Sequence, residues 1–148
     1  MPVSDEQVQA LRAYLSGDFA TYDRLRNQLS GMADQSAWGA LIGAGFYEAV
    51  DRRFARNGAA SDNAAIVGYI ADVRGRSDKL AEDIEPTVAE RLIQDSLGRG
   101  SVDDIDGRTR LGTRFLLLAA LIVDEQLDER GVEAFLAEAR KVADHWLS

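Results

Sequence analysis

Residues 115–123 form a run of nine apolar residues, and this run constrains the fold more than any other part of the chain. A helix that crosses a membrane needs about 20 apolar residues. Extended back to Leu111, the stretch covers thirteen positions and already includes Arg114. It is too short and too polar to span a membrane, and we expect no membrane association.

The same run is too apolar for an ordinary surface helix, because it covers every face of about two and a half turns. Burying one large apolar side chain contributes roughly 1.5–3 kcal/mol, whereas a whole domain is stable by about 5–15 kcal/mol. A solvent-exposed run of this kind would consume most of that stability. We therefore expect a central helix over about residues 107–126, enclosed by the other helices. The alternative is a helix with one side covered in an oligomer.

The rest of the chain carries repeated signals for helix starts. Ser4 and Gln7 fit a capping box, Asp18 and Asp128 are placed to cap further helices, and Pro86 suits a first helical turn. No convincing strand pattern and no long linker occur. The sequence predicts an all-α protein with one compact domain over residues 1–148. We expect an orthogonal or bundle-like arrangement of six to eight helices.

The stretch "LRAYLSGDFATYDRLRNQLS", residues 11–30, resembles a single tetratricopeptide unit, with a glycine–aspartate turn between two amphipathic helices. A tetratricopeptide array repeats about every 34 residues, and no second copy follows. The resemblance therefore implies one helical hairpin rather than a repeat protein.

The charge balance narrows the range of partners. The chain has 25 acidic and 17 basic residues, a formal net charge of −8. Such a surface repels nucleic-acid phosphates and anionic lipids, and it suits either solubility alone or a basic partner. Residues 62–100 resemble a helix-turn-helix motif in their pattern. They carry eight acidic and five basic residues, however, so we expect no nucleic-acid binding.

Two features bear on the location of the protein. The chain has no cysteine, which fits a reducing compartment, and "MPVSDEQVQA" lacks the basic start and apolar segment of an export signal. We expect a cytoplasmic protein. Fifteen arginines against two lysines hint at a GC-rich bacterial genome.

The acidic stretch before Gly107 does not fit a calcium loop. An EF-hand with Gly107 at its sixth position would begin at Val102 and end at Thr113, where oxygen ligands are required. His145 is the single histidine and cannot supply a histidine-based metal site by itself. We expect no metal, no cofactor and no catalytic set, which favours a non-enzymatic protein without deciding the question.

Three glycines lie close together at Gly39, Gly43 and Gly45, yet they do not form a dinucleotide fingerprint. That motif needs a preceding strand and a further glycine where Glu48 stands. Gly39 and Gly43 share one helix face, so we expect another helix to cross closely there.

Two arginine clusters are candidate contacts for an anion or a partner. The first lies near the start of the apolar helix, where the helix dipole disfavours cations, so we expect specific partners for it. Those partners are either the nearby acids Asp95, Asp103 and Asp104, or an anionic ligand or acidic surface. The second cluster ends the helix predicted over residues 36–56, where cations normally satisfy terminal carbonyls. The clusters are Arg108, Arg110 and Arg114, and Arg52, Arg53 and Arg56.

These observations favour a binding or regulatory protein that acts on another protein, with a second copy of the chain as one candidate partner. The alternative is a binder of a small anionic molecule, or a cofactor-independent enzyme, with a pocket between helices. In that alternative, the arginines at 108, 110 and 114 would hold the anionic group, and Tyr47 or Trp38 would line the cavity.

Overall fold

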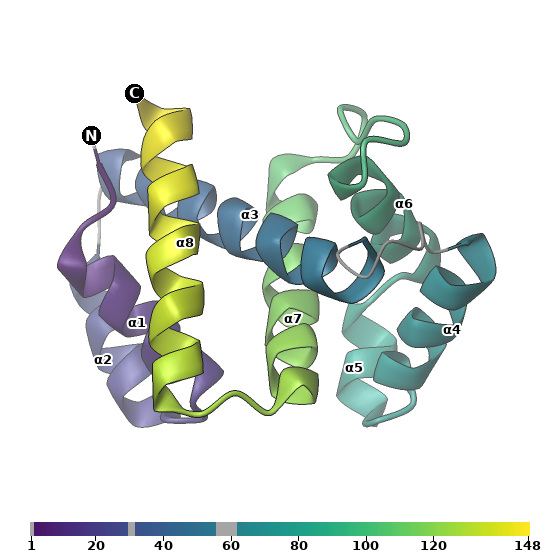
Figure 1. The fold of residues 1–148 in the computed structure, drawn as a ribbon, viewed down its shortest axis with the longest axis horizontal. Helices are drawn as coiled ribbons and strands as arrows, with labels where there is room; N and C mark the ends of the chain where they lie inside the picture. Colours follow the sequence, from purple (N-terminus) through teal and green to yellow (C-terminus); the bar gives the residue numbers. More distant parts are fainter. Residues whose placement is uncertain (1, 30–31, 56–61) are drawn as a thin grey trace. The chain divides into compact units, whose positions relative to one another are not determined.

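The computed structural model describes residues 2–29, 32–55 and 62–148. Over these residues the protein has eight helices and no strand, which confirms the all-α fold class (Figure 1). No helix in these ranges is long and apolar enough to cross a membrane. The helices are α1 (Asp5–Leu15), α2 (Phe19–Gln28), α3 (Met32–Phe54), α4 (Asn63–Arg74), α5 (Asp78–Asp83), α6 (Pro86–Ser96), α7 (Gly107–Glu125) and α8 (Glu129–Leu147).

The helices begin at the capping residues that the sequence indicates. Ser4 Oγ accepts a hydrogen bond from the Gln7 amide at 3.2 Å, and Gln7 Oε1 accepts one from the Ser4 amide at 2.9 Å. This reciprocal pair is the predicted capping box. Asp18 caps α2, Asp128 caps α8, and Pro86 occupies the first turn of α6.

The chain forms two compact units. Unit 1 comprises Met1–Glu48 and Ile122–Ser148, and unit 2 comprises Ala49–Leu121. Helices α3 and α7 each contribute residues to both units. The single domain over residues 1–148 stays a prediction.

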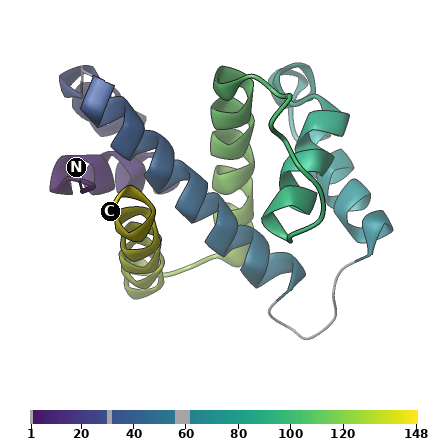
Figure 2. The same ribbon diagram turned by 90° about the horizontal axis from the view of Figure 1, so that it is seen from above.

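Unit 1 is built on the predicted α1–α2 hairpin, whose turn contains Gly17 at a φ of +80°. Glycine favours this left-handed conformation because it has no Cβ. Helix α8 lies beside α1 (Figures 1 and 2). Arg140 of α8 fastens the N-terminal segment, since its Nη1 donates to Asp5 Oδ1 at 2.7 Å and its Nη2 donates to the Val3 carbonyl at 2.8 Å. The largest fully buried side chains of unit 1 are Leu11, Leu41, Ile42, Phe46, Phe135 and Leu136.

Unit 2 gathers α4, α5 and α6 (Figure 1). Arg74 at the end of α4 holds the short helix α5 in place. Its Nε donates to the Ile84 carbonyl at 2.8 Å, and its Nη2 donates to the Ala81 carbonyl at 2.9 Å. Ile66 of α4 and Leu92 of α6 are fully buried, so the unit has an apolar core of its own.

Helix α7 spans Gly107–Glu125, close to the predicted range of 107–126. Leu117 and Leu118 are fully buried, as expected for an apolar run of this length. Val123, the last residue of the run, is instead 59% exposed. The apolar run therefore emerges at the surface at its C-terminal end, in unit 1. The central position of α7 in the fold stays a prediction.

Candidate functional site

Arg114, in the first of the predicted arginine clusters, has an acidic partner within unit 2. Its Nη2 lies 3.7 Å from Asp95 Oδ2 of α6, and both side chains are largely covered. Burial lowers the pKa of Arg114, while the Asp95 charge opposes that shift. This contact confirms Asp95 as one of the nearby acids expected to balance the cluster, so Arg114 has a structural role between α6 and α7.

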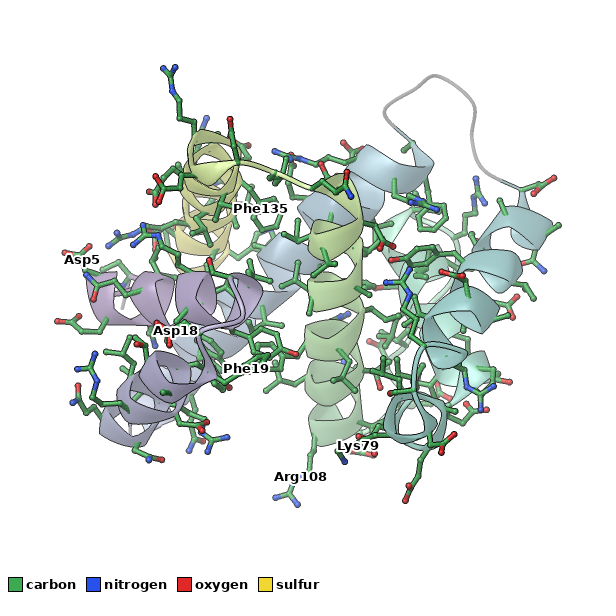
Figure 3. All side chains as sticks on the ribbon, turned by 90° about the horizontal axis from the view of Figure 1, so that it is seen from below. Asp5, Asp18, Phe19, Lys79, Arg108 and Phe135 are labelled. Atoms are coloured by element: carbon green, nitrogen blue, oxygen red, sulfur yellow. The ribbon has the colours of Figure 1, made fainter. Side chains whose placement is uncertain are left out.

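Asp106 caps the N-terminus of α7. Asp106 Oδ1 accepts from the Thr109 amide at 2.9 Å, and Asp106 Oδ2 accepts from Thr109 Oγ1 at 2.7 Å. These hydrogen bonds lower the pKa of Asp106. Arg108 projects away from the end of α7 (Figure 3). Neither Arg108 nor Arg110 forms an ion pair with any residue in the described ranges, so an anion contact at these two arginines stays a prediction.

Asp104, another acid considered for this cluster, pairs with a different arginine. Arg91 Nη1 donates to Asp104 Oδ2 at 2.9 Å, and Arg91 Nη2 donates to the Ser101 carbonyl at 2.8 Å. The Arg91 hydrogen bonds lower the pKa of Asp104 to about 2. Arg91 thereby ties the loop after α6 to that helix.

Arg52 and Arg53 lie in the last turn of α3, and Arg56 lies outside the described residues. The Arg53 guanidinium stacks 4.6 Å from the centroid of the Tyr69 ring, which in turn packs against Phe54 at 5.9 Å. This cation–π contact uses Arg53 to cover an aromatic side chain of unit 2. The anion-binding role of the second cluster stays a prediction.

No group of three or more His, Cys, Asp or Glu side chains among the described residues is arranged to hold a metal ion. His145 is exposed in the last turn of α8.

A cavity of about 510 Å³ opens in unit 1 between the end of α1, the end of α7 and the start of α8. We name it the α1–α8 groove. Its volume falls in the range of about 300–1,000 Å³ that is typical of ligand sites. The exposed side chain of Val123 lies in its wall. The apolar lining residues are Leu15, Ile122, Val123, Leu127 and Val132.

Half of the polar residues in the wall of the groove are acidic, namely Asp128, Glu129 and Glu133. Arg12 Nη2 donates to Glu133 Oε2 at 2.9 Å, so the one cation among the described residues of the wall is neutralised within the groove. Asp128 Oδ1 accepts from the Gly131 amide at 2.8 Å as the cap of α8. Glu129 is exposed and forms no ion pair with the described part of the chain. The groove thus combines an apolar lining with uncompensated negative charge.

Gln126 joins the groove through an unusual backbone conformation. Its φ is +53°, and it is the one non-glycine residue with a positive φ in the described ranges. A residue with a Cβ pays for this left-handed conformation with about 1–2 kcal/mol of strain. Gln126 directly follows the C-terminus of α7 and lines the α1–α8 groove.

Two exposed aromatic side chains lie next to each other on unit 1. Tyr47 of α3 and Trp146 of α8 are 45% and 51% exposed, and their ring centroids are 6.5 Å apart at 77°. Large aromatic residues are enriched among the side chains that dominate protein interfaces. Tyr47 and Trp38 belong to unit 1, whereas Arg108 belongs to unit 2, so neither unit alone combines the predicted arginine site with these rings.

The expectation of a close helix crossing at the two glycines is wrong in part. A Cβ on Gly39 would meet no atom within 4 Å, and one on Gly43 would lie 3.5 Å from Trp146 Cζ3, an ordinary contact. The bulky indole, rather than a second backbone, fills the space beside Gly43.

The net negative charge of the chain is concentrated in unit 1, because unit 2 balances its acidic residues with nearly as many basic ones. The residues of unit 1 include thirteen Asp and Glu against six Lys and Arg, a formal net charge of −7. Unit 2 has twelve against eleven, a net charge of −1. The groove therefore lies in the unit that carries nearly all of the net charge of −8.

The sequence pattern predicted that residues 115–123 are enclosed by the other helices or covered on one side in an oligomer, and it did not reveal the groove. One signal was present, because Asp124 and Glu125 follow the run immediately and mark where α7 leaves the core. The neighbouring α1 wall depends on a tertiary contact that no local pattern encodes.

Comparison of the chain with protein family models, curated proteins and solved structures gives no match.

Proposed function

We propose that this protein is a non-enzymatic binding protein that recognises a basic partner protein through unit 1. The observation that carries the proposal is the division of charge, with −7 on unit 1 and −1 on unit 2. An acidic face speeds association with a basic partner and disfavours acidic competitors.

Exposed apolar side chains on the same unit support the proposal. Val123, Tyr47 and Trp146 are each at least 45% exposed. Stable protein interfaces need apolar side chains that lose their water when the partner binds, because charges at the rim of an interface add little affinity by themselves. Unit 1 offers both components, acidic side chains for orientation and apolar side chains for affinity.

The test is capture of the tagged full chain from its native organism, followed by native mass spectrometry of the eluate. We expect a stoichiometric complex with a protein that presents a basic surface. A complex at twice the chain mass identifies a second copy as the partner and contradicts the basic-partner proposal. Recovery of the chain with nothing bound also contradicts the basic-partner proposal. Recovery of the chain with a small anionic molecule bound supports the alternative of an anion-binding protein.

A further inference from the structure

We propose that the α1–α8 groove binds a basic amphipathic helix of the partner protein. This inference rests on the proposed function and adds the site and the form of the ligand. Its first basis is shape, since a groove of about 510 Å³ has apolar lining residues on the end of α1, the end of α7 and the start of α8. An amphipathic helix inserts apolar side chains spaced three and four residues apart into grooves of this kind.

The second basis is charge. Glu129 and Glu133 are four residues apart on α8, so they share one face about one helical turn apart. Glu133 is balanced by Arg12, with 2.6 Å between Arg12 Nε and Glu133 Oε1. Glu129 has no such balance among the described residues. A Lys or Arg that flanks the apolar face of the bound helix pairs with Glu129.

The third basis is the exposed position of Val123. A valine that is 59% exposed at the end of a buried apolar run leaves part of that run uncovered. Covering it with a partner side chain removes apolar surface from water, and the surrounding carboxylates select a partner whose own rim is cationic.

The probe is a fluorescently labelled 15-residue Leu/Lys peptide with leucines on one helical face, titrated into the full chain. Its dissociation constant is measured by anisotropy, and its site is mapped by amide chemical shifts. We expect shifts centred on Ser16, Leu127 and Val132. A peptide of the same composition without an apolar face should bind about tenfold more weakly, and a Leu/Glu peptide should not bind.

Val123→Asp separates apolar docking from simple charge attraction. It makes the groove more acidic, so pure electrostatics predicts tighter binding, whereas helix docking predicts binding about tenfold weaker. Val67→Asp is the matched control, because Val67 is a 46% exposed valine on α4 of unit 2. Glu129→Gln should weaken binding severalfold and provides a second variant at an exposed position.

Unchanged or tighter binding by Val123→Asp, or shifts centred outside the groove, overturns the groove assignment. If the native partner is captured equally by Val123→Asp and by the wild type, the groove assignment is wrong and the binding function stands. If the peptide binds in the groove but no protein is captured from the native organism, the proposed function is wrong and the chemistry of the groove stands.

Discussion

Arg12 of α1 and Glu133 of α8 face each other in the wall of the α1–α8 groove. Arg12 Nε lies 2.6 Å from Glu133 Oε1, and Arg12 Nη2 donates to Glu133 Oε2 at 2.9 Å. The short Nε contact lacks hydrogen-bond geometry, and Nε is buried without another partner among the described residues. The pair therefore fixes α1 beside α8 and cancels the one positive charge of the groove.

Replacing Glu133 with Gln should lower the free energy of unfolding by about 0.5–1 kcal/mol, because solvent screens this half-exposed pair. Urea unfolding at low and high salt measures the change. Arg12→Gln and the double variant complete a mutant cycle. A coupling energy of zero at low salt would show that the pair does not fix α1 to α8.

Two glycines in helices should respond differently to alanine. Gly39→Ala should raise the free energy of unfolding by up to about 1 kcal/mol, since the added Cβ meets open space and alanine favours the helix. At Gly131 the new Cβ would lie 3.1 Å from Leu127 Cβ and 3.3 Å from the capping Asp128 Oδ1. Gly131→Ala should therefore give no gain. Chemical denaturation of the two variants compares them, and an equal gain at both positions contradicts the packing of Leu127 over α8.

Gln126→Gly should stabilise the protein by about 0.5–1 kcal/mol. Glycine adopts a φ of +53° without the Cβ strain, and this relief exceeds the extra chain entropy that glycine loses on folding. Thermal unfolding measures the gain. Gln126→Ala is the matched control, because it keeps the Cβ and should not stabilise. A loss of stability on Gln126→Gly would show that the Gln126 side chain contributes more than the backbone strain costs.

The pKa of Asp104 provides a test in unit 2. Its hydrogen bonds from Arg91 lower the pKa to about 2, so the charged form is favoured in the folded protein. The resulting stabilisation is present above the ordinary pKa of about 3.9 and is lost as the pH falls toward about 2. Carboxyl NMR titration should show this low midpoint, and Arg91→Gln should raise it, although the backbone hydrogen bond to the Asp104 carboxylate still keeps it below the ordinary pKa. An unchanged midpoint in Arg91→Gln would contradict the pairing.

Local sequence signals predicted the helices well because their causes are local. Ser4, Asp18, Pro86 and Asp128 each act within three residues of the helix they begin, so the caps are readable directly from the sequence. The apolar run also predicted α7 nearly to its ends.

The site was less predictable, because tertiary contacts create it. Arg12 and Glu133 are 121 positions apart in the chain, and nothing in either local stretch indicates that they meet. Another helix was expected to cross closely at Gly43. The indole of Trp146, which is far from Gly43 in the sequence, lies there instead. Both arginine clusters were candidate contacts for an anion or a partner, yet Arg114 and Arg53 make structural contacts within unit 2.

The most direct test of the central claim is the amount of native partner captured by two charge-matched variants. Glu6→Gln with Glu129→Gln removes two exposed acids from unit 1, and Glu82→Gln with Asp103→Asn removes two from unit 2. Both variants change the net charge equally. We expect the first variant to capture several times less partner than the wild type and the second to capture the wild-type amount. Equal capture by both variants would contradict recognition through the acidic side chains of unit 1.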